Sequence, residues 1–404
     1  MAVTCNQQPA TYTPGYSPQI FTAESTQSAQ PNFSYTILCT DLLSGDTQYY
    51  DVPARPDGDM VFDAKPFAES LLTHYIPLNT YGWQEADGVR KIRVNIGETY
   101  GTTPAYASGS DIDYIVWNGI VDWKEYPNYD QNVYVYDSDI DNNVYLNTNT
   151  EEDTYSGRSN YLHALTSKIN DIYSIQIKTY SQAGVLLGTS TIANPNVGSS
   201  AYNVKYLCID IGHKGLSEMA SGLVGGDYPI ITDNVAYYTI DDIYDDGSWF
   251  VITPLKTITI KCEPKYDVYT VHYLRKNGAF QTLNFAKLSE NVLSTSRVNY
   301  SKLPFTYTAQ QYAYLSSARV QFTLNTDTKQ TIKLNTDWLT EDEVDYHKDL
   351  IDSPVIYFDF GTTDGYLQVM LNTNSVKLNK RYNDKLFNFT MDFEYAHSNT
   401  RQSS

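Results

Sequence analysis

Cysteine is scarce in this sequence, and the four cysteines that are present have no metal-binding spacing. Cys5, Cys39, Cys208 and Cys262 form no Cys-x-x-Cys pair, and no histidine lies beside them at a ligand spacing. Neither a zinc site nor a disulfide framework is therefore predicted. Cys262 alternates with isoleucines two and four residues earlier, which predicts a small buried side chain.

Histidine is also sparse, and the sequence lacks the common catalytic and phosphate-binding motifs. It contains no HExxH, GxSxG, GxxxxGK[ST] or GxGxxG pattern. The six histidines are far apart in the sequence, and each is predicted to be a surface or structural residue: His74, His163, His213, His272, His347 and His397. We therefore predict a protein that is not an enzyme, with no catalytic residue, no cofactor and no metal ligand.

No long apolar run occurs in the chain, and its first residues do not have the pattern of a secretion signal. A membrane-spanning helix needs about 18 or more apolar residues, and no such run is present. The first 19 residues, MAVTCNQQPATYTPGYSPQ, have neither a basic region nor an apolar core. These features predict a protein that is made in a cytoplasm and either stays soluble or leaves by a route that needs no signal.

Basic residues are outnumbered, with 28 Lys and Arg against 47 Asp and Glu, which gives a net charge of −19. This charge disfavours tight binding to nucleic-acid phosphates or anionic membranes. Charged residues make up only 19% of the chain, and the sequence is instead rich in polar β-branched residues and in tyrosine, of which there are 37. Such a composition favours strands, and a length of 404 residues predicts two or three domains.

The clearest strand signal lies near the C-terminus, over Leu386–Ala396 (LFNFTMDFEYA). Its aromatic residues and methionine alternate with Asn, Thr, Asp and Glu, so one face is apolar and the other polar. A second signal is the pair Asn277-Gly278 between two alternating runs, which predicts a hairpin with a type I′ turn. Short helices are predicted at 65–75, where Asp63 can accept from the first turn, and at 340–350, where Thr340 begins a capping box.

These patterns predict an all-β chain of two or three Ig-like β-sandwich domains with short helical inserts. The predicted parts are an extended N-terminal arm (1–32), a first sandwich (33–121), an irregular aromatic and acidic excursion or projecting hairpin (122–160), a second sandwich (161–265), a C-terminal β domain (266–397) and a polar tail (398–404). The closing strand over 386–396 is expected beside VIYFDF or YLQVML.

Two acidic clusters are interpreted as solvated turns. Asp137, Asp139 and Asp141 have the spacing of a calcium loop, but that loop requires a glycine and a glutamate where this chain has Asn142 and Thr148. The second cluster, Asp241, Asp242, Asp245 and Asp246, shows no ligand pattern. No bound ion is predicted at either cluster.

Several runs of the chain resemble a family of virion structural proteins. The runs are PDGDMVFDAKPFAESLL, YIVWNGIVDWKEYPNYD, CEPKYDVYTVHYLRKNGAFQTLNFAKLSE and NDKLFNFTMDFEYAHSN, which occur in this order, and the resemblance spans roughly residues 33 to 397. They resemble tail and neck proteins from phages of Bacteroidetes, including crAss-like phages. The resemblance implies Ig-like β domains in a tail or neck assembly, and it provides no catalytic residue to carry over.

We therefore expect a structural protein of a phage particle, in a multi-copy ring, neck or tail component that helps to form the conduit for DNA ejection. Its expected partners are copies of itself and other tail or portal-vertex proteins, without sequence-specific nucleic-acid binding, and its expected location is the virion after assembly in the host cytoplasm. A negative wall would repel phosphates and let a duplex slide. The tyrosines leave a receptor- or carbohydrate-binding module of a tail spike or fibre open, and a glycan-cleaving enzyme is a third alternative.

Overall fold

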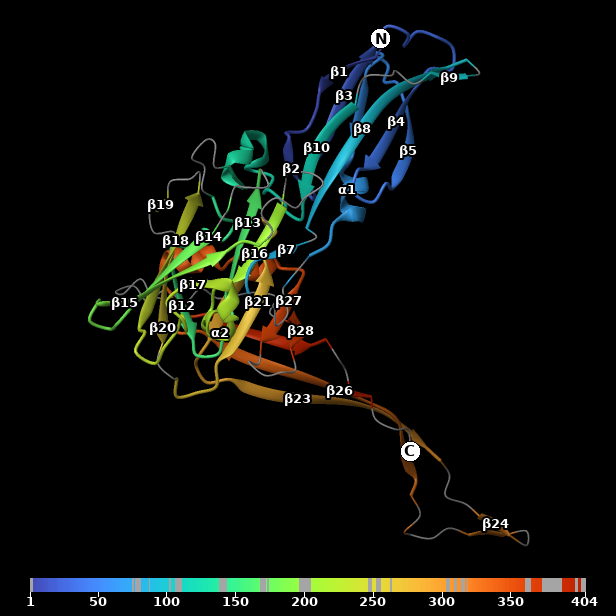
Figure 1. Ribbon diagram of the computed structural model, residues 1–404. Helices are drawn as coiled ribbons and strands as arrows, with labels where there is room; N and C mark the ends of the chain where they lie inside the picture. The colour runs from blue at the N-terminus through green and yellow to red at the C-terminus, as the bar shows by residue number, and fades with distance from the viewer. Residues whose placement is uncertain are drawn as a thin grey trace. The chain divides into compact units, whose positions relative to one another are not determined.

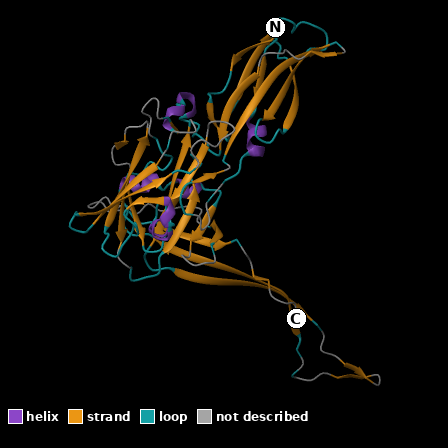
Figure 2. Ribbon diagram, in the orientation of Figure 1, coloured by secondary structure: helices purple, strands orange, loops and turns teal. Residues whose placement is uncertain are grey.

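The computed structural model is built mainly from strands, with a few short helices (Figure 2). It describes residues 3–400 with gaps at 75, 77–80, 87, 102, 106–110, 138–143, 168–171, 173, 196–204, 246–248, 252–255, 262–263, 303–305, 309–310, 314–316, 318, 360–364, 373–386 and 397–398. The chain forms two compact units: unit 1 holds residues 1–263 and 273–282, and unit 2 holds 264–272 and 283–404. The all-β prediction is confirmed, whereas the Ig-like strand order stays a prediction.

The first part of unit 1 is a pair of sheets around one apolar core (Figure 1). The smaller sheet has the order β1-β3-β6 and the larger one β2-β10-β8-β4-β5, with β9 attached to β8. The strands are β1 (Val3–Gln7), β2 (Tyr12–Pro14), β3 (Ile20–Ser25), β4 (Ser34–Asp41), β5 (Thr47–Pro53), β6 (Met60–Asp63), β8 (Val89–Tyr100), β9 (Thr103–Ala105) and β10 (Asp111–Trp117).

The predicted extended arm over residues 1–32 is wrong for the part that the structure describes. Strands β1 and β3 pair with each other, and β2 pairs in parallel with β10. Val3, Phe21 and Ala23 are buried in the first core, so these residues complete the sandwich from one side. The composition suggested disorder because aliphatic residues are few, but Phe21, Ala23 and Ser25 alternate with exposed or half-buried residues.

A short helix, α1 (Lys65–Leu71), follows β6 as predicted, although it ends earlier than 75. The Asp63 carboxylate accepts from the backbone N–H of Lys65 at 3.0 Å and from that of Gln19 at 2.8 Å. Phe67 and Ala68 are buried against the first core. Asp63 therefore fixes the helix start and a segment near the N-terminus at the same time.

The second part of unit 1 is another pair of sheets around a core of its own. One sheet has the order β11-β13-β16-β7, and the other has β12-β20-β18-β14-β15-β17, with β19 attached to β18. The elements are β7 (Gln84–Ala86), β11 (Val135–Tyr136), β12 (Glu151–Tyr155), β13 (Tyr161–Thr166), β14 (Ser174–Tyr180), β15 (Leu186–Ala193), β16 (Lys205–Asp210), α2 (His213–Glu218), β17 (Val224–Gly226), β18 (Tyr237–Asp245), β19 (Trp249–Val251) and β20 (Lys256–Lys261), with single 3₁₀ turns η1 (Tyr126–Asn128), η2 (Gln131–Val133) and η4 (Ser221–Leu223).

The segment 122–160 is irregular, as predicted, but its described ends do not project from the unit. The Tyr129 hydroxyl donates to the Tyr12 carbonyl at 2.8 Å, and η1 and η2 lie on this stretch. Strands β11 and β12 then join the two sheets of the second sandwich by parallel pairing with β13 and β20. Parallel pairing with a distant strand leaves no local turn signal, which is why the sequence pattern did not indicate these strands.

The acidic cluster that begins at Asp241 is not a solvated turn. Asp241 lies within β18, is buried, and pairs with the ammonium of Lys178 at 2.5 Å. The β-sheet therefore holds this carboxylate beside a partner strand. Asp246 lies outside the described residues, as do Asp139 and Asp141 of the other cluster and the predicted buried Cys262.

The predicted hairpin at Asn277-Gly278 is confirmed, but its turn differs from the predicted type. Strands β21 (Tyr269–Leu274) and β22 (Phe280–Phe285) flank a loop closed by a bond from the Arg275 N–H to the Ala279 carbonyl, 2.8 Å long. Only Gly278 in this loop has a positive φ, +91°, whereas a type I′ turn needs two such residues. The loop is thus a type I turn followed by a left-handed glycine, which forms a bulge.

Unit 2 is organised around a sheet of the order β22-β21-β27-β28-β29-β26-β23, with β30 attached to β26. Its further elements are β23 (Glu290–Ser301), β24 (Thr306–Thr308), β25 (Gln311–Ala313), β26 (Gln321–Asn335), α3 (Glu341–Tyr346), α4 (Asp349–Asp352), β27 (Ile356–Asp359), β28 (Tyr366–Leu371), β29 (Thr390–Tyr395) and β30 (Asn399–Thr400). The closing strand, β29, pairs with β28, whose sequence is YLQVML, as predicted. Residues 399–400 of the predicted polar tail pair with β26.

The alternation over β29 and the residues before it is confirmed. Phe387, Phe389, Met391 and Phe393 are buried, whereas Thr390 and Asp392 are exposed. The ring of Phe393 packs against those of two further buried phenylalanines of the unit 2 core, at centroid distances of 5.9 and 5.1 Å. Leu386 lies outside the described residues.

The helix predicted at 340–350 forms with its capping box. The Glu343 N–H donates to the Thr340 hydroxyl at 3.3 Å, and the Thr340 N–H donates to the Glu343 carboxylate at 2.7 Å. The structure has two short helices here, α3 and α4. Between them the helical pattern changes, because the N–H groups of Leu350 and Ile351 donate to carbonyls three residues earlier instead of four.

An exposed feature of unit 2 is a two-stranded ribbon, which we define as residues 290–302 and 319–335. Strands β23 and β26 run side by side away from the rest of the sheet (Figure 1). Every residue of β23 is exposed, and only Ile332 and Leu334 of β26 are buried. The sequence of β23 has no apolar alternation, because a strand exposed on both faces has no buried side to mark.

Candidate functional site

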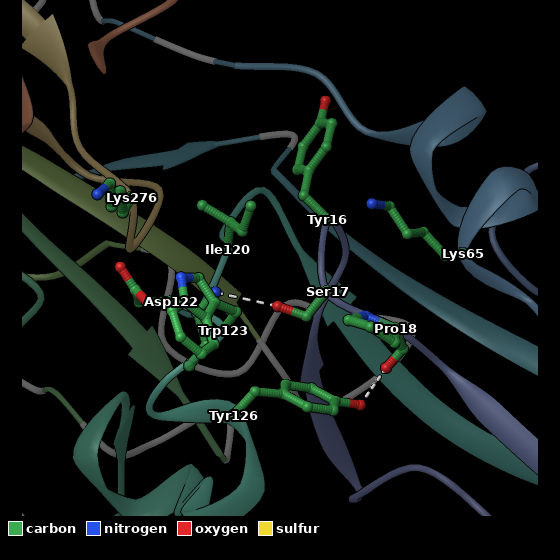
Figure 3. A pocket seen from close by; sticks show the side chains of 10 residues that line it. Tyr16, Ser17, Pro18, Lys65, Ile120, Asp122, Trp123, Tyr126 and Lys276 are labelled. Atoms are coloured by element: carbon green, nitrogen blue, oxygen red, sulfur yellow. Dashed lines mark hydrogen bonds between the residues drawn. The ribbon is translucent and has the colours of Figure 1, made fainter.

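A hollow of about 410 Å³ lies on unit 1, and its lining comes from four separate stretches of chain. Residues 16–18, the first residue of α1 and residues 120–126 supply most of the wall. Lys276, in the turn after β21, supplies the remainder. Figure 3 shows Lys65 and Lys276 on opposite sides of the hollow, with the ring of Trp123 between them and Tyr126.

Backbone and side-chain hydrogen bonds fix this irregular wall. The Val121 N–H donates to the Ser17 hydroxyl at 3.0 Å, and the Tyr126 hydroxyl donates to the Pro18 carbonyl (Figure 3). The Ile120 N–H donates to the Lys276 carbonyl at 2.6 Å. The first two bonds hold residues 120–126 against the N-terminal segment, and the third holds them against the turn after β21.

The hollow combines an exposed aromatic ring with charged groups. The Trp123 side chain is 78% exposed, and the Lys124 ammonium lies 5.6 Å from its ring centroid. Lys65 is paired with Glu69 at 3.3 Å, a surface pair that solvent screens. Burial raises the pKa of the Tyr126 hydroxyl, so this group stays protonated and keeps its bond to the backbone. Such a surface can stack against a planar or pyranose ring and attract an anionic group.

Many of the tyrosines that suggested a binding surface are core residues instead. Tyr35, Tyr114, Tyr161, Tyr238 and Tyr273 are among the largest fully buried side chains. No catalytic or ligand-binding motif in the sequence includes Trp123. The signal for it is the run WKEYP, in which two charged residues lie between two aromatic ones and no aliphatic residue is present.

The histidines are not brought together at one site in the part of the chain that the structure describes. His163 on β13 is fully buried, and burial lowers its pKa to about 3, so its ring is neutral at physiological pH. Its neighbour across the sheet is Cys208, whose pKa burial raises well above its usual value. A neutral thiol beside a neutral imidazole cannot act as a nucleophile and base at pH 7. His397 lies outside the described residues.

Of the three described cysteines, Cys39 and Cys208 are buried. Burial raises the pKa of Cys39 to about 12 within the first core. Cys5 is half-buried and donates to the Gln7 carbonyl at 3.1 Å. Within the described residues, no three His, Cys, Asp or Glu side chains gather as a metal site would require.

A buried polar cluster in unit 1 has a structural arrangement. The Lys256 ammonium and the Glu152 carboxylate lie 2.7 Å apart, and both side chains are almost fully buried. The Gln281 amide also donates to Glu152, at 3.0 Å, and the Asn147 amide donates to Gln281 at 2.8 Å. These bonds connect β12, β20 and β22, so the cluster ties distant segments together. Solvent and substrate have no access to the ion pair.

The ribbon of unit 2 is the second surface with unusual properties. Its exposed apolar side chains include Val292, Leu293, Val298 and Leu324. Near its far end, the rings of Tyr300 and Phe322 stack at 5.5 Å, and the Arg319 guanidinium lies 5.1 Å from the Phe322 ring. Exposed apolar groups of this kind are typical of surfaces that a partner covers.

A comparison with protein-family models found no match for this chain, and a comparison with curated proteins also found none. Among the described residues, no helix has the length and apolar character that crossing a bilayer requires.

Proposed function

We propose that this chain is a non-enzymatic structural protein of a phage virion, present in many copies in a ring, neck or tail component. The sequence resemblance to virion tail and neck proteins motivates the proposal. The all-β architecture supports it, because rigid sandwiches provide surfaces for permanent contacts without any moving catalytic part.

The observation that carries the proposal is the exposed ribbon. A two-stranded hairpin without a covered face is at best marginally stable alone. Strand β23 has all 12 residues exposed, and it is the outermost strand of its sheet. Its outer row of backbone N–H and C=O groups can pair with another chain. An assembled particle provides such a covering partner permanently.

The net charge of −19 supports a place beside the DNA path. An acidic wall repels phosphates, so a duplex can slide without being held. A map of the assembled particle tests this part directly. Acidic side chains should line the lumen, and a lumen lined by lysine and arginine would refute a conduit role.

The proposal as a whole is tested by purifying intact particles and identifying their proteins by mass spectrometry. This chain should be present in many copies and in a fixed ratio to the other virion proteins. Cryo-electron microscopy of the same particles should then place it in the neck or tail. Particles that are complete and infective but lack the chain would overturn the proposal.

A second candidate is a receptor- or carbohydrate-binding module, which the hollow at Trp123 favours. The full chain should then bind glycans on an array, and Trp123→Ala should abolish this binding. Trp338→Ala, which alters another exposed tryptophan in unit 2, is the matched control. Binding that is equal in the two variants and the unaltered chain would exclude the hollow as the glycan site.

A further inference from the structure

The ribbon differs in charge from the rest of the chain. Residues 290–302 and 319–335 contain five basic and two acidic residues, a net charge of +3. The remaining residues contain 45 acidic and 23 basic residues, a net charge of −22. The segment that lacks a covered face is therefore the basic part of an otherwise strongly acidic protein.

The basic side chains of the ribbon are available for a partner. Arg297 and Lys302 are exposed, and neither has an ion-pair partner within the described part of the chain. Lys333 is half-buried and likewise has no such partner there. Lys329 alone is paired, with Glu394 at 2.8 Å, on a surface where solvent screens the pair.

The dimensions of the ribbon also fit a docking element. Twelve residues of strand extend about 40 Å, and two paired strands are about 10 Å wide, so each face offers about 400 Å². A standard interface takes about 800 Å² from each partner, which the ribbon provides when both of its faces are covered. The exposed valine and leucine side chains then lie inside the contact, and the arginine and lysine heads reach its rim.

We infer that the ribbon of one copy binds the acidic surface of a second copy of this chain. The inference rests on the proposed function and names the contact that builds the assembly. Two acidic bodies of net charge −22 repel each other, and the ribbon is the segment whose charge offsets that repulsion. An identical neighbour supplies the complementary charge by necessity.

The geometry of such a contact determines the kind of assembly. The ribbon and the surface that receives it are different parts of the chain, so a contact made in one direction only is head-to-tail, whereas two copies that exchange ribbons would close as a dimer. A head-to-tail contact generates a ring when its rotation closes and a filament when it does not. A closed ring is the form that a neck or tail component requires.

The test uses the full chain and compares two triple charge reversals. The ribbon variant is Arg297→Glu, Lys302→Glu and Arg319→Glu. The control variant carries the same change in net charge at exposed basic residues outside the ribbon: Arg55→Glu, Lys265→Glu and Lys348→Glu. The mass of each species is followed by native mass spectrometry and light scattering, from about 50 to about 500 mM NaCl.

The unaltered chain should form oligomers that weaken as salt rises. The ribbon variant should raise the Kd of self-association at least about 100-fold, whereas the control variant should change it less than about tenfold. A variant in which Asn-Gly replaces residues 295–328 should be monomeric and should shorten the assemblies of the unaltered chain when the two are mixed. That capping effect is the signature of a head-to-tail contact.

Three results would overturn the inference. One is self-association of the ribbon variant with the unaltered Kd, and another is an unaltered chain that stays monomeric at every salt concentration. The third is ribbon-dependent binding to a short DNA duplex without any effect on oligomers, which would make nucleic acid the partner. Each of these results would refute the ribbon contact without refuting the proposed function, as long as purified particles still contain the chain. Failure of the inference and failure of the proposed function can therefore be told apart.

Discussion

Replacement of Phe389 by aspartate should unfold unit 2. The Phe389 side chain is fully buried, and its N–H donates to the Thr336 hydroxyl at 2.9 Å. Removing a buried phenylalanine side chain to alanine costs about 3–5 kcal/mol, and a carboxylate adds the cost of desolvating a polar group without a partner, about 1–3 kcal/mol or more. The sum reaches the whole free energy of unfolding of an ordinary domain, about 5–15 kcal/mol.

The measurement is hydrogen exchange of the full chain, followed by mass spectrometry on peptides from 283–400. This choice follows unit 2 separately from unit 1. Phe389→Asp should remove amide protection from β28 and β29 together, and Phe389→Leu should weaken it only slightly. Thr390→Asp is the matched control, because Thr390 is exposed on the opposite face. Unchanged protection in Phe389→Asp would refute the burial argument.

Three further substitutions test other parts of unit 1. Lys256→Met should lower the free energy of unfolding, measured by urea denaturation, by about 3–5 kcal/mol, because it leaves a buried carboxylate unpaired. Lys261→Met is the control on the same strand. Its ion pair is exposed, so the substitution should cost at most about 1 kcal/mol. Gly278→Ala should lower the melting temperature more than Gly101→Ala, because both have positive φ but only at Gly278 would a Cβ meet a backbone oxygen, at 2.4 Å. The pKa of His163 is lowered from 6.5 to about 3 in the folded state, so between about pH 6.5 and about pH 3 the unfolded state binds more protons. The stability of the protein therefore falls as pH falls through this window, by up to about 1.4 kcal/mol per pH unit. His163→Phe should remove this pH dependence, which a comparison of urea midpoints of the two proteins would show.

The parts of the fold that sequence patterns predicted are those with one buried face or a local cap. The valine and isoleucines of β8 at 92, 94 and 96 alternate, and all three are fully buried. Thr340 and Glu343 form their capping box because the two residues are only three positions apart. Both signals depend on residues close together in the sequence, so no tertiary information was needed.

The parts that the patterns missed depend on distant segments. Strand β2 has three residues, and it exists because β10 pairs with it in parallel across a separation of about one hundred residues. The hollow at Trp123 is assembled in the same way, from stretches near residues 17, 65, 122 and 276. No local periodicity marks such an arrangement, and only the fold brings these side chains together.

Strand β23 shows most clearly how a missing pattern can carry information. Its residues have strand propensity, with valines, threonine and tyrosine, yet they have no buried face within their own chain. Register is weakly specified in such a strand, and here the irregularity at Val298 and Asn299 is the local feature that anchors it against β26. A 12-residue strand that gains no burial from its own unit is stabilised only by its hairpin partner and by whatever covers it. The exposure of residues 290–301 and the basic charge of the ribbon are the two observations from which we infer a contact with the acidic surface of a second copy.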